Sequence, residues 1–356
     1  MRSSATLIRC LAVGSDMGVD LGDLVPRTPI GLRDLAGKVV AIDGHNALYQ
    51  FLSIIRQPDG TPLRDRRGRI TSHLSGLFYR TANLVEAGIK PVYVWDGLPH
   101  ALKRATIDGR AAVKAKAESA RQAALAAGDT RTAFSKATQT SHLDREMLGE
   151  AKKLLDALGI PHLSAPGDGE AQASHMAARS DVHAAVSQDY DALLFGAPRL
   201  VRNLAVTGRR KLPGRQVYVD VEPEEILLAP SLSALGLTRE QLVDVGLLVG
   251  TDFHPGVHGV GPKKAVKLVK EHGNLEGALA KLGVSIPEAD EIRRIFLSPA
   301  VTSDYALAWK PASEAAVTEL LVHEHDFSLD RMENTFAKYR VAKEQMRQRS
   351  LDAFFG

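Results

Sequence analysis

The chain has 356 residues, of which 44% are hydrophobic and 24% are charged, and its formal net charge is +3. This balance is typical of a globular protein and excludes wholesale disorder. No apolar run approaches the roughly 20 residues that a membrane span needs. Cys10 is the only cysteine, which excludes a disulfide framework and indicates a reducing compartment.

Two short stretches concentrate positive charge, "RDRRGR" over 64–69 and "GRRKLPGR" over 208–215. The net charge is too small to establish nucleic-acid binding by itself. Local clusters of this kind can face phosphates. Solvated basic loops are the alternative interpretation for each stretch.

The first predicted strand, "KVVAID" over 38–43, ends in Asp43, and a second, "PVYVWD" over 91–96, ends in Asp96. Between them, residues 70–88 place apolar side chains such as Leu74 and Leu77 at helical spacing, and Gly88 marks the end. A strand, a helix and a second strand are therefore expected in this order.

Residues 97–144 change in composition to Ala, Lys, Arg, Gln and Thr, as in "RAAVKAKAESARQAALAAG" over 110–128. Helix propensity is high there, but the apolar residues are small and have little surface to bury. The pattern favours a helical insertion over the functional edge of a sheet, and a solvated surface helix is the alternative.

A helix is expected over 144–159, where "DREMLGEAKKLLDALG" repeats the apolar spacing and ends in a glycine. "PHLSAPGDGE" then carries Asp168 and Glu170, and "HAAVSQD" ends in Asp189, with Asp191 two residues later. Alternating strands and helices predict an α/β fold with a mainly parallel sheet covered by helices on both faces.

Residues 238–273 predict a helix that ends near Val249, a loop with Asp252, and a second helix that begins near Pro262. Gly259 and Gly261 precede the second helix. The lysines of its first turn, Lys263 and Lys264, are unfavourably placed in the field of the helix dipole. This placement therefore indicates that an anion binds there. Two helices joined by a glycine hairpin indicate a grip on a nucleic-acid backbone.

The acids share one expected location, the carboxyl edge of a parallel sheet, where ligands bind. Such a group is electrostatically unfavourable without cations, and oxygen ligands favour Mg²⁺ or Mn²⁺ over Zn²⁺. Two such ions can activate a water and stabilise the leaving oxygen of a phosphodiester. The predicted metal ligands are Asp43, Asp96, Asp168, Glu170, Asp189, Asp191 and Asp252.

From Met17 onward the chain resembles the structure-specific flap endonucleases of archaea and eukaryotes. The resemblance rests on motifs that span nearly the whole chain in order, among them "MGVDLGDLVPR", "GIKPVYVWDG", "GEAQA", "SQDYDALLFGAPRLVRNL" and "LVGTDFHPGVHGVGPKKA". It implies a 5′ nuclease that cleaves flaps at single/double-strand junctions in DNA replication and repair, has 5′-3′ exonuclease activity, and uses two Mg²⁺ ions.

By position, the resemblance assigns the family's metal ligands to all seven acids. It implies that Lys103 and Arg110 contact the scissile phosphate at the base of a helical arch, formed by residues 97–145. It implies a helix–hairpin–helix element, often with a K⁺ ion, that holds the downstream duplex. The DNA-binding residues implied by the resemblance or by the glycine hairpin are Tyr49, Arg56, Arg80, Asp168, Gly250, Asp252, Gly259, Gly261, Lys263 and Lys264.

The sequence departs from the family pattern at three places. Asp168 stands where the family usually has Glu, so one metal is expected to be held more loosely or through water. His45 occupies an unusual position after the first strand, where an ordinary hydrogen bond is favoured over metal ligation. The arch is richer in alanine and less charged than usual.

Two alternatives to a flap endonuclease stay open at this point. An RNA-cleaving nuclease of the related acid-lined fold would leave the glycine hairpin and the arch unexplained. A non-catalytic DNA-junction binder is the other, because Asp168 departs from the family pattern.

The C-terminal residues "QRSLDAFFG" have the spacing of a sliding-clamp binding peptide, carried by Gln348, Leu351, Phe354 and Phe355. Paired phenylalanines at a chain end indicate a protein partner, and packing of the tail on the core is the alternative. No basic nuclear-targeting stretch follows, so a prokaryotic cytoplasm is expected rather than a nucleus.

The expected organisation is an N-terminal nuclease region over 17–114, an internal nuclease region over 132–272 that includes the helix–hairpin–helix, a helical region over 273–340 and a clamp-binding tail over 341–356. Residues 1–16 lie outside the resemblance and are no convincing secretory signal. They are expected to be disordered, or to precede a true start at Met17.

Overall fold

The structure is a computed structural model that describes residues 19, 21–57, 60–103, 116–120, 122–124, 126–129, 132, 136, 142–206, 208–211 and 218–341. The predicted extension 1–16, Arg110 and the clamp-binding tail 342–356 lie outside these residues. No helix in the described ranges is both long and apolar enough to cross a bilayer.

A seven-stranded sheet forms the centre of the molecule, in the order β1-β9-β6-β5-β2-β3-β4. The five strands from β6 to β4 run parallel, and β9 and β1 join the β6 edge antiparallel. The predicted mainly parallel sheet is thus confirmed. The strands are β1 (Thr28–Pro29), β2 (Val39–Asp43), β3 (Lys90–Trp95), β4 (His162–Ser164), β5 (Ala184–Val186), β6 (Arg199–Arg202) and β9 (Glu224–Leu227).

One face of the sheet is covered by α2 (Gly44–Ile54), α3 (Ser72–Glu86), α6 (Arg145–Leu158) and α14 (Glu314–Thr318). The sequence of α6 explains its limits. Asp144 accepts a hydrogen bond from Met147 N at 2.9 Å and caps the start, whereas Gly159 ends the helix in the left-handed conformation. Its apolar stripe packs into a core that includes Phe78 of α3 and Trp95 of β3.

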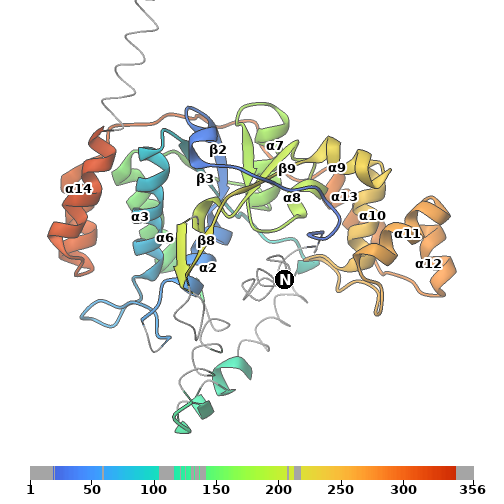
Figure 1. The fold of residues 1–356 in the computed structure, drawn as a ribbon, viewed down its shortest axis with the longest axis horizontal. Coiled ribbons are helices and arrows are strands. Elements are labelled where there is room, and N and C mark those ends of the chain that lie inside the picture. The colour runs from blue at the N-terminus through green and yellow to red at the C-terminus, as the bar shows by residue number, and fades with distance from the viewer. Residues whose placement is uncertain are drawn as a thin grey trace, which may run out of the picture.

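The opposite face carries a second core with seven helices around it. They are α7 (Gly169–Ala178), α8 (Asp191–Leu194), α9 (Leu228–Leu235), α10 (Arg239–Val249), α11 (Pro262–His272), α12 (Leu275–Leu282) and α13 (Ala289–Leu297). Figure 1 shows the sheet between these helices and the α3–α6–α14 side. The predicted covering of both faces is therefore confirmed.

A helix over residues 329–341 packs into the first of these two cores through Met332 and Phe336. Several short elements complete the described chain. They are η1 (Leu32–Leu35), η3 (Leu204–Val206), the π-helical η4 (Glu319–Glu324), and a ribbon of β7 (Gly208–Lys211) paired with β8 (Tyr218–Val221). The basic stretch 208–215 thus begins in a strand rather than in a loop. In the insertion, residues 116–120 and 122–124 are helical and lie well away from the sheet (Figure 1), as a helix with little to bury should.

Gly159 also connects the end of α6 to the segment that contains Lys310. Its φ is +67°, its carbonyl accepts a hydrogen bond from Lys310 N at 2.9 Å, and an added Cβ would lie 2.1 Å from Lys310 O. Gly283 has the same φ of +67°, but nothing lies within 4 Å of its Cβ position. A comparison of the two glycines therefore separates the cost of the left-handed backbone conformation, which both share, from the cost of close packing, which only Gly159 has.

Gly283→Ala should lower the free energy of unfolding by about 1 kcal/mol, the cost of a left-handed alanine. Gly159→Ala should lower it by roughly 2–4 kcal/mol, because Lys310 must also move away. Urea unfolding of the two variants measures the difference. Equal losses would show that Gly159 is needed only for its conformation.

Candidate metal centre

The carboxyl ends of three adjacent strands bring the first acids together. Asp43 is the last residue of β2, Asp96 directly follows β3, and Asp189 lies just beyond β5. These strands are neighbours in the order β5-β2-β3 and run parallel. Their acidic ends therefore meet at one edge of the sheet, as the sequence predicted.

Helix N-termini position the next acids at the same edge. Asp168 caps α7 by accepting hydrogen bonds from Glu170 N at 2.9 Å and Ala171 N at 3.3 Å. Gly169 N donates to Asp96 at 2.7 Å, and Ala192 N in α8 donates to Glu170 at 3.1 Å. Backbone amides at helix starts thus hold carboxylates in place. The short side chain of Asp168 suits a cap, which is a local reason for aspartate at this position.

Two further residues contact these acids, and neither was predicted from the sequence. Asn46 donates from its backbone to Asp43 at 3.0 Å and from its side-chain amide to Asp189 at 2.8 Å. Val19 N donates to Asp191 at 2.7 Å. An amide three residues after a strand-end acid was the only local signal for Asn46, and its link to Asp189 depends on tertiary structure.

The acids raise one another's proton affinity. Burial is the largest cause that raises the pKa of Asp43, and Asp96 is the next. Burial and then Asp189 raise the pKa of Glu170, and burial and then Asp191 raise the pKa of Asp189. Carboxylates from different elements therefore share one electrostatic environment.

Asp252 and Asp168 belong to the same environment. Burial, followed by Asp252, raises the pKa of Asp191 to about 7, and Asp168 adds to this effect. Burial, followed by Asp168, also raises the pKa of Asp96. Each of the seven predicted acids thus interacts with at least one other acid of the group.

Lys103 is a positive charge among these acids. Its Nζ forms an ion pair with Asp168 and lies 3.6 Å from Asp252. Burial alone would lower the pKa of Lys103, but the carboxylates of Asp168 and Asp252 outweigh burial and raise it. The ammonium therefore stays charged at neutral pH, as a phosphate-binding role requires.

The donor set fits hard divalent cations. All seven side chains offer carboxylate oxygens, and burial together with like charge favours exchange of their protons for a cation. In the part of the chain described, no three His, Cys, Asp or Glu side chains are already arranged at ligating distances.

The predicted helix–loop–helix is present next to this site, with α10 ending at Val249 and α11 beginning at Pro262. Gly250 has φ +119°, and an added Cβ would lie 2.9 Å from Pro255 O, so the tight loop needs glycine there. Gly261 has an ordinary φ of −87° and nothing within 4 Å of its Cβ position. Its glycine leaves open space for another backbone.

The first turn of α11 carries the two predicted lysines. Lys263 and Lys264 are exposed, and Lys264 Nζ donates to Gly259 O at 3.2 Å. Gly259 has φ +76°, a left-handed conformation that favours glycine. Two cations thus stand beside the unpaired amides of a helix start, which is an arrangement that suits phosphate.

The remaining predicted residues lie on α2, α3 and the loop between them. Tyr49 is half-buried in α2, and Arg80 is in α3, where burial lowers its pKa. Arg56 donates to Gly60 O at 2.9 Å within the loop. His45 Nδ1 accepts from Asp96 N at 3.0 Å, which confirms an ordinary hydrogen bond at this position.

Two family models match the chain. The XPG N-terminal domain matches residues 24–117, and the XPG I-region matches residues 159–252. Both ranges contain acids of the site.

Curated relatives match over nearly the full length. Flap endonuclease 1 of Archaeoglobus fulgidus is 51% identical, covering 95% of this chain and 100% of the relative. Flap endonuclease 1 of Pyrococcus abyssi is 49% identical, covering 95% and 98%. The fold and the acidic site define an XPG-type nuclease. At this identity and coverage, the chain belongs to the flap endonuclease 1 family.

Solved structures agree with this assignment. Flap endonuclease-1 from Methanococcus jannaschii superposes with a TM-score of 0.73 at 37% identity, covering 92% of this chain and all of that one. The catalytic core of Rad2 in complex with DNA substrate has a TM-score of 0.66 at 22% identity, covering 88% and 96%. The second likeness shows the fold alone.

Asp191→Asn should stabilise the metal-free protein, and the gain should depend on pH. The folded-state pKa of about 7 lies above the ordinary value of 3.8, so ionisation destabilises the native state as pH rises between these values. The gain should be small near pH 4, grow towards pH 7 and stay constant above it. Urea unfolding in EDTA at several pH values measures it.

The exposed Asp304, replaced by Asn, is the matched control and should show no such pH dependence. A gain for Asp191→Asn that is the same at every pH would contradict the repulsion described for the acidic cluster.

Proposed function

We propose that the chain is a metal-dependent 5′ flap endonuclease with 5′-3′ exonuclease activity, which cleaves flaps at DNA junctions in replication and repair. The observation that carries this proposal is the convergence of seven interacting carboxylates at the carboxyl edge of the sheet. The names of the relatives support the proposal further, because those at about 50% identity are flap endonucleases.

Family membership implies dependence on a divalent metal, and we assign Mg²⁺, with Mn²⁺ as a substitute. The ligands would be Asp43, Asp96, Asp168, Glu170, Asp189, Asp191 and Asp252, whose oxygens suit these ions. Two ions bound there would supply an activated water and stabilisation of the leaving oxygen of a phosphodiester. K⁺ at the glycine hairpin is a further proposed ligand.

The chain's own groups position the DNA. Lys103, charged and half-buried beside the acids, is assigned to the scissile phosphate, together with Arg110. The amides at the start of α11, with Lys263 and Lys264, are assigned to phosphates of the downstream duplex. Neither group contacts the edges of the bases, so we expect the protein to recognise the shape of the junction and not its sequence.

Cleavage of labelled DNA tests the nuclease proposal. Asp189→Ala should reduce turnover of a 5′-flap substrate in Mg²⁺ to less than about 1% of wild type, since removing a metal ligand typically costs several powers of ten in rate. Binding of the flap should persist, because the ions serve the reaction more than affinity. Asp304→Asn again provides a surface control.

The substrate panel separates the alternatives. A 5′-labelled flap, a blunt duplex and an RNA of the same sequence are incubated with Mg²⁺ or with EDTA. Short metal-dependent products at the flap junction support the proposal. Preferred cleavage of RNA, or binding of the flap with no cleavage of any substrate, would contradict it.

The C-terminal tail is proposed to bind a sliding clamp through Gln348, Leu351, Phe354 and Phe355, which lie outside the described residues. Replacing both phenylalanines by alanine should weaken clamp binding at least tenfold, because paired aromatic side chains dominate such contacts. Basal cleavage should be unchanged. Equal clamp affinity of the double variant in a calorimetric titration would contradict the assignment.

We further propose that the protein works on DNA in a prokaryotic cytoplasm, in line with the archaeal sources of the relatives.

A further inference from the structure

A single arginine, Arg239, joins three helices beside the metal centre. It is the first residue of α10, and its guanidinium donates from Nε to Leu194 O at 3.2 Å and from Nη2 to Phe296 O at 2.8 Å. Leu194 is the last residue of α8, and Phe296 lies in the last turn of α13. The function proposed above assigns no role to Arg239.

Arg239 is unfavourably placed for its own helix. A positive charge in the first turn of α10 opposes the helix dipole, and Thr238 already caps this end by accepting a hydrogen bond from Gln241 N at 3.2 Å. The C-termini of α8 and α13 are the opposite case, because their last carbonyls carry partial negative charge that favours a cation. The arginine therefore stabilises the ends of two neighbouring helices and not the start of α10.

The chain leaves space for this guanidinium at Gly196. Gly196 has φ +88°, and an added Cβ would lie 2.7 Å from Arg239 Cζ and 2.9 Å from Arg239 Nε. Gly37 has a similar φ of +80°, but nothing lies within 4 Å of its Cβ position. Glycine is therefore needed after α8 for the close approach of Arg239 as well as for its backbone conformation.

The short helix α8 depends on contacts at both of its ends. A helix of four residues has little stability of its own. Its start is held at the metal centre, where Ala192 N donates to Glu170 at 3.1 Å beside Asp191. Leu194, at its other end, is fully buried, so its carbonyl needs a donor. One helical turn spans roughly 5 Å along the axis, and a shift at Leu194 would therefore move Asp191.

Helix α10 also leads to a second acid of the site. It packs on α8 at Gly246, where an added Cβ would lie 2.8 Å from Leu194 Cδ1. Asp252 follows the last residue of α10 by three positions, and its charge interacts with that of Asp191. The contacts of Arg239 and Gly246 therefore fix α10 against α8, and with it the spacing of two proposed metal ligands.

We propose that Arg239 is a positioning residue for the metal centre: it holds α8 and α10 together, so that Asp191 and Asp252 keep the spacing that binding of divalent cations requires. Loss of the guanidinium leaves two buried helix-end carbonyls without this donor and lets α8 shift. The affinity for Mg²⁺ should therefore fall. This inference rests on the metal-dependent function proposed above.

Calorimetric titration of Mg²⁺ into the metal-free protein compares Arg239→Gln with wild type. Arg239→Gln should raise the Kd for Mg²⁺ about tenfold, which is a typical effect of removing a group that orients metal ligands. Arg239→Lys should recover part of the affinity, because an ammonium can still donate to one of the two carbonyls. A Kd of Arg239→Gln equal to that of wild type would overturn the proposal.

Arg293→Gln is the control for a general loss of stability. Arg293 joins α13 to α10 and α12, since its Nε lies 3.0 Å from Asp244 Oδ1 and its Nη1 lies 3.1 Å from Glu276 Oε1. Arg293→Gln should lower the free energy of unfolding in urea and EDTA at least as much as Arg239→Gln, because it leaves the buried Asp244 without its charged partner. It should leave the Kd for Mg²⁺ unchanged. Equal rises in Kd in the two variants would reject the specific role of Arg239.

Gly196→Ala disturbs the same contact from its other side. It should raise the Kd for Mg²⁺, because the added Cβ displaces the guanidinium, whereas Gly37→Ala carries the same backbone cost and should not. Combination with Arg239→Gln should have little further effect, since both changes act through one contact. Gly196→Ala also replaces Arg239→Gln if that variant does not fold. Wild-type affinity in folded Gly196→Ala, or fully additive effects, would contradict the proposal.

Cleavage assays distinguish a failure of this inference from a failure of the proposed function. The rate of Arg239→Gln on a 5′-flap substrate should fall at low Mg²⁺ and return towards the wild-type rate at saturating Mg²⁺. A loss of rate that saturating Mg²⁺ does not restore would reject a role in metal binding. Absence of cleavage by the wild-type protein would reject the nuclease function, whereas wild-type cleavage with an unchanged Kd in Arg239→Gln would reject only the role of Arg239.

Discussion

Repulsion among buried carboxylates is the constraint on which this structure depends. Strands β2, β3 and β5 end side by side, and each delivers an aspartate to the same edge. Burial and like charge raise the pKa of Asp43, Asp189 and Glu170 far above their ordinary values. Binding of cations would relieve this repulsion. The proposed metal centre therefore follows from the order of the strands in the sheet.

Positive groups around the acids are arranged in two ways. Backbone amides at the starts of α7 and α8 donate to the carboxylates, and Lys103 places a side-chain charge between Asp168 and Asp252. The exposed cations of α11 and of the hairpin 64–70 face outward. The inner charges hold the acids, and the outer charges are suited to a polyanion much larger than the site. This division agrees with a nuclease that grips duplex DNA at a distance from the cleaved bond.

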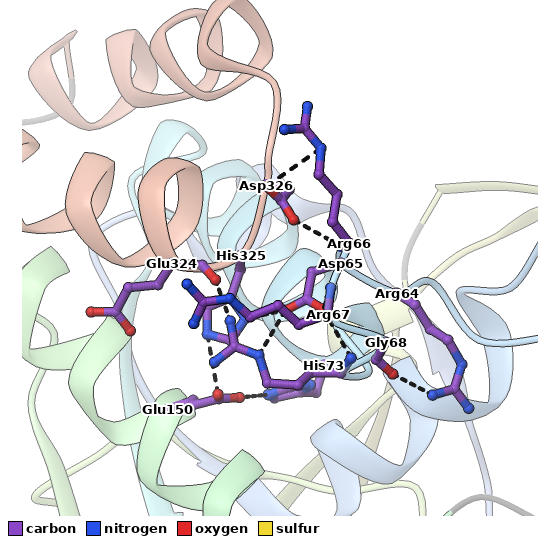
Figure 2. Close-up of polar contacts among 11 residues, drawn as sticks. Arg64, Asp65, Arg66, Arg67, Gly68, His73, Glu150, Glu324, His325 and Asp326 are labelled. Atoms are coloured by element: carbon purple, nitrogen blue, oxygen red, sulfur yellow. Dashed lines mark hydrogen bonds and ion pairs between the residues drawn. The ribbon is translucent and has the colours of Figure 1, made fainter.

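Local sequence was sufficient for the fold class and for the acids, because each depends on short-range patterns. The apolar runs that end in Asp43 and Asp96, and the glycine that ends α6, follow from strand and helix periodicity. The link from Asn46 to Asp189 spans 143 residues of the chain, and the hydrogen bond from Arg66 N to Asp326 spans 260. His325 likewise meets Asp65 and Glu150 from a distant part of the chain (Figure 2). No spacing rule connects such residues. Composition alone also could not show that the basic stretch 208–215 begins in a strand, because its first residues form β7 only by pairing with β8.

Calorimetric titration of Mg²⁺ into the metal-free protein, in buffers of different ionisation enthalpy, tests the central claim most directly. Because burial and the neighbouring Asp252 raise the pKa of Asp191 to about 7, and burial and Asp191 raise that of Asp189, ions that bind the cluster must displace protons near neutral pH. The account predicts saturable binding of two ions per chain with release of protons that diminishes as pH rises. Weak, unsaturable binding with no proton release would contradict the assignment of these carboxylates as a metal centre.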